Sequence, residues 1–224
     1  MRFLALLRKK RNRVFLFLCG VLPLTGCIRQ EQTWSFVLRR DGRVDLTIHQ
    51  DQVRSSEKTP EARHKEERDW FRQLRRSATS EQEGLKRAQA GGIRRTIHRD
   101  QAPFSVTTQA RLPSVESIGR LIDLKAPEGE VFVETPSPHR KRLVLKLTPP
   151  RTLPSPAPAT AGTPEEFDTP RWFFAPEKGR IVESEFCLIA PDRGSCRLDI
   201  LALDLAQKRS SSGSVQASVT WEQE

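Results

Sequence analysis

The sequence predicts an α+β fold in which an antiparallel sheet built from hairpins carries two or three helices on one face. Segments of alternating apolar and polar residues, typical of half-buried strands, occur in pairs joined by short turns. Other segments combine helix-capping residues with apolar side chains at helical spacing. The resulting order, strand-strand-helix, strand-strand-helix, strand-strand, is typical of helices that pack on one face of an antiparallel sheet.

The first predicted hairpin covers residues 33–50, after a short tether at residues 27–32. A two-residue loop, Asp41-Gly42, would place apolar residues opposite polar ones on the same face. A three-residue loop, Arg40-Asp41-Gly42, instead gives the apolar pairs Leu38–Val44, Phe36–Leu46 and Trp34–Ile48. We expect the three-residue loop, because the buried face fixes strand register and Gly42 suits the left-handed third position.

Helix signals follow this hairpin. Thr59 is the expected N-cap of a helix with Pro60 at its first position. Ser80 and Glu83 form the expected capping box of a second, shorter helix that ends at Gly91-Gly92. The next elements are expected in this order: strands at 93–99 and 104–112, a helix that begins at Ser114, and strands at 131–134 and 143–147.

The expected domain organisation is a signal peptide at 1–26, an α+β domain at 27–148, a linker at 149–170 and a β-rich extension at 171–224. The linker contains seven prolines among Ala, Thr and Ser, a composition typical of an extended spacer or an exposed loop. The extension is expected to hold strands at 180–190 and 196–205 and an edge strand at 215–221. It either forms a separate unit or completes the same sheet.

The first 27 residues have the features of a secretory signal. Met1–Arg13 carries six basic residues and no acid, and Val14–Leu24 is an uncharged, mostly apolar run of eleven residues. That run is shorter than the roughly 20 residues that span a bilayer, which favours a signal peptide over an anchor or core helix. Leu24-Thr25-Gly26-Cys27 resembles the lipobox of bacterial lipoproteins. The resemblance implies cleavage between Gly26 and Cys27, a diacylglyceryl group on the Cys27 thiol and acylation, typically with palmitate, of the new amino terminus.

Lipidation would hold the protein at a membrane without a spanning segment, since stable anchoring requires more than one acyl chain. In the lipoprotein family, an Asp after the cysteine favours retention in the inner membrane. Ile28 occupies that position here. The resemblance therefore implies a cell-envelope protein that is lipid-anchored to the outer membrane rather than to the inner one.

Removal of the signal changes the charge balance. Residues 1–26 contain six of the 38 basic residues and none of the 28 acidic ones, which leaves a net charge of +4 over 198 residues. A nucleic-acid-binding domain is typically strongly basic, so no nucleic-acid partner is expected.

Two cysteines remain in the mature chain besides Cys27, and an even pair in an oxidising compartment favours a disulfide between Cys187 and Cys196. Matching of apolar faces would pair Phe186 with Leu198, which puts the two cysteines on opposite faces and forbids a cross-strand bond. The conflict disappears if the strand ladder ends before Cys187.

The sequence offers little that indicates catalysis. The four histidines, His49, His64, His98 and His139, lie on different predicted elements and lack metal-ligand spacing. No nucleophile elbow or phosphate-binding loop is present. We therefore expect no metal, no cofactor and no enzymatic activity.

Basic clusters are the strongest indication of a binding surface. Arg140, Lys141 and Arg142 lie at a predicted hairpin, where they would contact anionic lipid or envelope glycan, or would serve only to solvate the surface. The order of elements in residues 27–148, together with the stretch Arg39–Ile48, resembles LppM-type bacterial lipoproteins, a family linked to lipid recognition at the envelope.

The expected function is that of a lipid-anchored envelope lipoprotein acting as a non-enzymatic binding or structural module, with an unknown protein partner. One alternative is a carrier that holds an acyl chain or glycolipid between sheet and helices. A second is a hydrolase of envelope polymers, which would need titratable residues that converge in a cleft.

Overall fold

The computed structural model describes residues 28–122, 130–147, 170–199, 202, 203, 206 and 215–223. The helices in this part of the chain are α1 (Pro60–Arg75), α2 (Ser80–Arg87) and α3 (Glu116–Ile122). The strands are β1 (Ile28–Leu38), β2 (Val44–Ser55), β3 (Gly91–Arg99), β4 (Phe104–Leu112), β5 (Glu130–Ser137), β6 (Arg140–Leu147), β7 (Arg171–Pro176), β8 (Arg180–Glu185), β9 (Cys187–Ile189), β10 (Cys196–Leu198) and β11 (Val215–Glu222).

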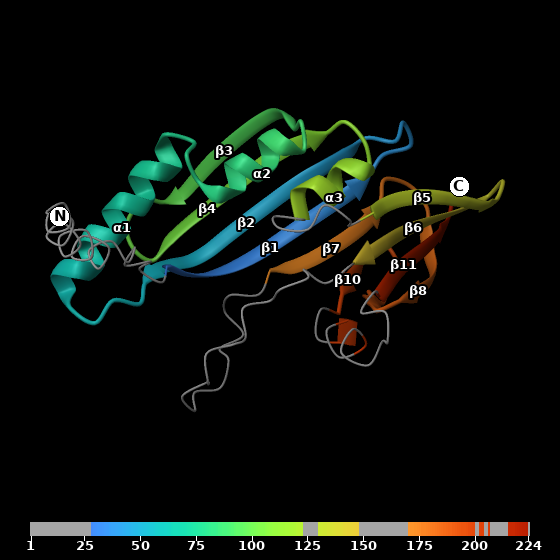
Figure 1. The fold of residues 1–224 in the computed structure, drawn as a ribbon. Helices are drawn as coiled ribbons and strands as arrows, with labels where there is room; N and C mark the ends of the chain where they lie inside the picture. The colour runs from blue at the N-terminus through green and yellow to red at the C-terminus, as the bar shows by residue number, and fades with distance from the viewer. Residues whose placement is uncertain are drawn as a thin grey trace, which may run out of the picture.

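Among the described residues, the strands form two sheets. The larger, seven-stranded sheet has the order β3-β4-β2-β1-β7-β10-β9, and the smaller, four-stranded sheet has the order β5-β6-β11-β8. Figure 1 shows the helices on one side of the larger sheet. The predicted α+β fold, built from antiparallel hairpins with helices on one face, is confirmed.

The first hairpin has the predicted register. Leu38 pairs with Val44, and the ladder continues in that register through Phe36 and Trp34. Gly42 adopts a φ of +83°, and the backbone N–H of Arg39 donates to the Arg43 carbonyl across a three-residue loop. The prediction of a tether at residues 27–32 is wrong for residues 28–32. These residues belong to β1, which begins at Ile28, and Ile28 pairs with Ser55.

The helix caps follow the sequence signals in α1 and differ in α2, which ends at Arg87 and not at the predicted Gly91-Gly92. Thr59 caps α1, and its side chain accepts from the backbone N–H of Ala62 at 3.3 Å. In α2 the cap is Thr79, not Ser80: its hydroxyl accepts from the Gln82 N–H at 3.4 Å, and its extended backbone marks the helix boundary one residue earlier. Ser80 already has helical geometry and is the first residue of α2.

The space between the helices and the larger sheet is filled with apolar side chains. The helices contribute Leu74, Leu85, Ile118 and Leu121, each at most 1% exposed. Val44, Leu46, Ile48 and other alternate residues of the strands face them, also fully buried. This period-two burial follows from the strand geometry, which points successive side chains to opposite faces.

Residues on the two sides of the Pro-rich segment share one sheet and one core. Strand β7 pairs with β1 in parallel, with Phe36 opposite Phe174, whereas every other described pairing is antiparallel. The rings of Phe36 and Phe174 stack at 5.1 Å between centroids, and each side chain is 1% exposed. An aromatic pair of this kind contributes about 1 kcal/mol beyond its area burial.

The C-terminal strands differ from the prediction. Strand β7 was not predicted, and the strand predicted at 196–205 ends at Leu198 as β10. The segment predicted as one strand at 180–190 divides at Phe186, whose φ is +57°, so β8 joins the four-stranded sheet and β9 joins the seven-stranded sheet. The predicted edge strand β11 instead lies between β6 and β8. Its residues Ala217 to Trp221 are buried on both faces, as an interior strand requires.

Candidate functional site

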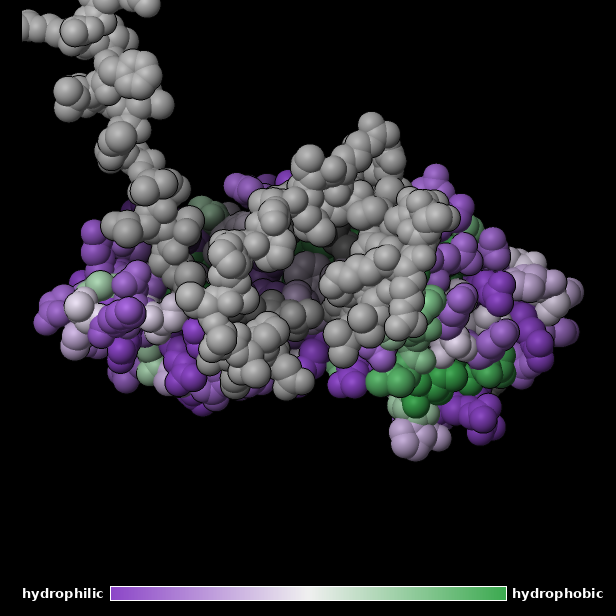
Figure 2. Space-filling view, turned by 60° about the horizontal axis from the view of Figure 1, so that its bottom comes forward, coloured by the Kyte–Doolittle hydropathy of each residue, from purple (hydrophilic) through white to green (hydrophobic). Residues whose placement is uncertain are grey.

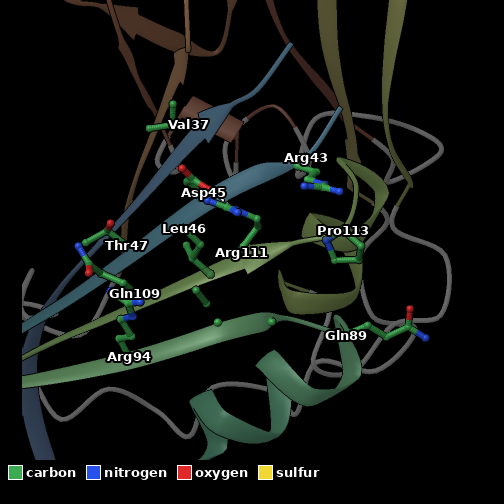
Figure 3. A pocket seen from close by; sticks show the side chains of 13 residues that line it. Val37, Arg43, Asp45, Leu46, Thr47, Gln89, Arg94, Gln109, Arg111 and Pro113 are labelled. Atoms are coloured by element: carbon green, nitrogen blue, oxygen red, sulfur yellow. Dashed lines mark hydrogen bonds and ion pairs between the residues drawn. The ribbon is translucent and has the colours of Figure 1, made fainter. Parts of the chain in front are cut away.

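A polar groove of about 740 Å³ lies where the ends of β1 to β4 meet, around the face of the larger sheet that the helices do not cover. Its size falls within the range of ligand-binding clefts, roughly 300–1,000 Å³. Figure 3 shows the labelled side chains of β2, β3 and β4 along this groove. Gly91 and Gly92 also line it, and a Cβ at either position would meet no atom within 4 Å.

The sheet geometry explains why the groove is polar. Asp45 and Thr47 alternate with the buried residues Leu46 and Ile48 along β2, and Gln109 and Arg111 alternate with Ala110 and Leu112 along β4. Figure 2, which turns the underside of Figure 1 toward the viewer, shows a largely hydrophilic described surface with an apolar patch on the side of the four-stranded sheet.

Asp45 is the centre of an ion-pair network at one end of the groove. It accepts from Arg39 and from the Nε of Arg111, the latter at 3.0 Å, while Arg39 also pairs with Glu177 at 2.6 Å. Partial burial of Asp45 by itself would raise its pKa, but hydrogen bonds and charge from Arg39 and Arg111 outweigh it and lower the pKa. Asp45 is therefore ionised at neutral pH, and the network links the β1–β2 turn to the β7–β8 turn.

The groove has more positive than negative side chains. Arg43, Arg94 and Arg111 line it with Asp45 as the single lining carboxylate among the described residues. Arg43 lies 3.6 Å from the exposed Asp41, and Arg94 makes no ion pair with any described residue. Guanidinium groups bind carboxylates and phosphates through paired hydrogen bonds, so this surface can hold an anionic ligand.

Two histidines meet on the same sheet face. The Nδ1 of His49 lies 3.0 Å from the hydroxyl of Thr107, and the Nε2 of His98 lies 2.8 Å from it. These histidines lie on different predicted elements, and their contact is not predicted from the sequence because it depends on the β3–β4–β2 pairing. Within the described ranges, no group of three or more His, Cys, Asp or Glu side chains is arranged to hold a metal ion.

A second polar cluster lies beneath the helices. Glu81 is 8% exposed, and neither of its carboxylate oxygens has a hydrogen-bond partner among the described residues. Desolvation raises its pKa, and Thr108 and Arg95 oppose that shift only in part. Arg95 donates to the Leu74 carbonyl and approaches the Thr108 hydroxyl at 3.5 Å, while its Nη2 atom is buried and without a partner in the same set of residues.

The predicted basic cluster lies at the start of β6, at the opposite end of the molecule from Ile28 (Figure 1). Arg140 is paired with Glu222 at 2.7 Å, and Arg142 lies 3.8 Å from Glu183. The contact of this cluster with an anionic surface stays a prediction. Gly26 and Cys27, the predicted cleavage and lipidation residues, lie outside the described residues.

The predicted cysteine pair is brought together by a strand register that differs from the one predicted by matching apolar faces. Cys187 pairs with Leu198 and Cys196 with Ile189, so both cysteines face the same side of the sheet, and the expected Phe186–Leu198 pairing is wrong. Both are free thiols, and the neighbouring Cys196 together with burial raises the pKa of Cys187. Bond formation between them stays a prediction.

None of the described helices is long and apolar enough to cross a membrane. The sequence matches no protein-family model and no curated protein. Among solved structures, the chain is similar to the folded domain of the LppM protein of Mycobacterium tuberculosis, determined by NMR, with 6% sequence identity and a TM-score of 0.40. The match covers 88% of this chain and 91% of that one. Similarity at this level does not assign the chain to a family.

Proposed function

We propose that the protein is a lipid-anchored lipoprotein of the bacterial cell envelope, with the outer membrane as its destination, and that its folded part is a non-enzymatic binding module. The observation that carries the proposal is the sequence Leu24-Thr25-Gly26-Cys27 behind a basic, then apolar, N-terminal segment. Acylation of Cys27 would attach the folded part directly to a membrane.

The polar groove is the proposed ligand surface, and its ligand is proposed to be an anionic envelope glycan. Three arginines and a single carboxylate line the groove among the described residues, which supports an anionic ligand. The carboxylate of the groove, Asp45, is held ionised by two arginines, so it is not suited to act as a general acid. A general acid instead needs a pKa near the working pH.

Metabolic labelling tests the anchor. Radiolabelled palmitate is expected to mark the native chain and to leave a Cys27→Ala variant unmarked, with the variant keeping its signal peptide. Density fractionation of the envelope then locates the labelled chain. An unlabelled native chain, processed in the same way as the variant, would refute the anchor.

Binding to heparin, as a model anionic glycan, tests the groove. The double variant Arg94→Gln, Arg111→Gln is expected to bind at least tenfold more weakly than the native protein, since each charge-assisted hydrogen bond contributes about 1.5–3 kcal/mol. Arg197→Gln is the matched control, because Arg197 is an exposed arginine of β10 that does not line the groove. Equal loss in the control would show that general surface charge, and not the groove, binds the glycan.

A further inference from the structure

We infer that a stripe of basic side chains on the outward face of α1 is the surface that contacts anionic phospholipid headgroups of the membrane that holds the anchor. The stripe consists of Lys65, Arg68 and Arg72 of α1 and of Arg76, the C-cap residue of the helix. This inference rests on the proposed lipid anchor at Cys27 and adds to it the orientation of the protein on the bilayer.

The anchor would leave no spacer between the bilayer and the larger sheet. Ile28, the residue after Cys27, is already the first residue of β1 and pairs with Ser55 at the end of β2. Consecutive Cα atoms lie about 3.8 Å apart. An acylated Cys27 would therefore hold this end of β1 and β2 at the membrane surface.

Helix α1 is fixed to that same end of the sheet (Figure 1). The backbone N–H of Ser55 donates to Glu67 at 3.2 Å, and the Ser55 hydroxyl donates to Glu66. The rings of Trp70 and Phe71 pack on Phe104 with centroid distances of 5.4 and 5.1 Å. The middle of α1 therefore lies beside the residue that pairs with Ile28.

These contacts turn two of the acidic residues of α1 toward the sheet, while Glu61 and Asp69 remain on the outward side beside the stripe. Glu66 and Glu67 turn toward Ser55, whereas the four basic residues of the stripe are exposed. A period of 3.6 residues puts the stripe opposite the side that carries Glu67, Phe71 and Leu74. Arg72 pairs with Asp69 at 2.9 Å. Lys65 and Arg68 make no ion pair with any described residue, so their charges are available to a partner.

The position of the anchor identifies that partner as the membrane. A basic side chain close to an anionic bilayer contributes about a fivefold gain in partitioning. The hairpin with Arg140 and Lys141 lies at the other end of the molecule and points away from a bilayer attached at residue 27 (Figure 1). The basic stripe on α1 is therefore expected to contact the membrane, and the basic hairpin is not.

Vesicle binding by the protein without its acyl anchor tests which of the two basic regions contacts the membrane. The whole mature chain, residues 27–224 with Cys27→Ser, is exported behind a signal peptide that is cleaved without lipidation. Its sedimentation is measured with vesicles of phosphatidylcholine and phosphatidylglycerol (7:3) and of phosphatidylcholine alone, at 50 mM salt. The compared variants are K65E/R68E in the stripe, the conservative K65R/R68K, and R140E/K141E in the hairpin, each checked by circular dichroism for an unchanged melting profile.

The parent chain is expected to bind the anionic vesicles and not the neutral ones. K65E/R68E is expected to lower the partition coefficient at least tenfold, while K65R/R68K and R140E/K141E stay within twofold. Binding that is lost in the hairpin variant but kept in the stripe variant would overturn the inference. So would absence of binding by the parent chain, or equal binding to both vesicle types. Palmitate labelling of the native chain reports the anchor separately, so failure of the anchor and failure of the stripe are distinguishable.

Discussion

Replacement of Phe174 by alanine tests whether residues 28–147 and 170–223 unfold together. Phe174 is 1% exposed and stacks on Phe36 across the parallel β1–β7 pair. Truncation of a buried phenylalanine costs about 3–5 kcal/mol, which includes the cavity that it leaves. For a protein of this size, the melting temperature is expected to fall by about 6–20 °C, since each kcal/mol shifts it by roughly 2–4 °C.

The assay is thermal unfolding of residues 27–224, followed by circular dichroism and by tryptophan fluorescence. Phe173→Ala is the matched control, because the neighbouring side chain points to the other face of β7 and is partly exposed. It is expected to lower the melting temperature by less than half as much. Both probes should report one transition in each variant. Two separated transitions, with the N-terminal strands unaffected by Phe174→Ala, would refute the shared core.

Three further predictions concern single features of the fold. Oxidation is expected to join Cys187 to Cys196 and to stabilise the protein by about 3 kcal/mol through closure of a short loop. Mass spectrometry measures bond formation as a loss of 2 Da relative to the reduced chain. An oxidised sample that keeps the reduced mass and an unchanged melting temperature would contradict the prediction. Glu81→Gln is expected to raise the free energy of unfolding at pH 7 by about 1–3 kcal/mol and to have little effect below the pKa of Glu81 in the unfolded chain. The reason is that the pKa of Glu81 is raised in the folded state, so its ionisation destabilises the fold as the pH rises. Urea unfolding at pH 3 and 7 measures the effect, and a less stable variant at pH 7 would refute it. Gly179→Ala is expected to destabilise the protein by about 1–3 kcal/mol, since the φ of Gly179 is +118° and a Cβ there would lie 2.2 Å from the Glu222 carbonyl oxygen. Gly91→Ala is the control, because a Cβ at Gly91 would lie in open space. Equal melting temperatures of the two variants would refute the clash.

Local chemistry made much of the fold predictable. The three-residue loop with Gly42 followed from the alternation of apolar residues on two adjacent strands, and the Thr59 cap with Pro60 followed from helix-end chemistry. Both depend on residues close together in the chain. The α+β class followed in the same way from the order of such local elements.

Features that depend on distant partners were not predictable. The division of residues 180–190 at Phe186 and the interior position of β11 are set by which sheet each strand joins. The same holds for the candidate site: Asp45, Arg94 and Arg111 come from three strands, and their common groove exists only once β2, β3 and β4 are paired. No spacing in the sequence marks these three residues as neighbours.

The parallel pairing of β1 with β7 imposes an order on folding during synthesis. Arg39 and Glu177, which meet at this junction, are 138 positions apart in the chain. Contacts between distant positions form slowly, because a long loop must close first. The first strand therefore waits for its parallel neighbour until the last quarter of the polypeptide has emerged. For the exported lipoprotein proposed above, this delay would be useful, because a chain with an incomplete sheet can still pass unfolded through a translocation channel.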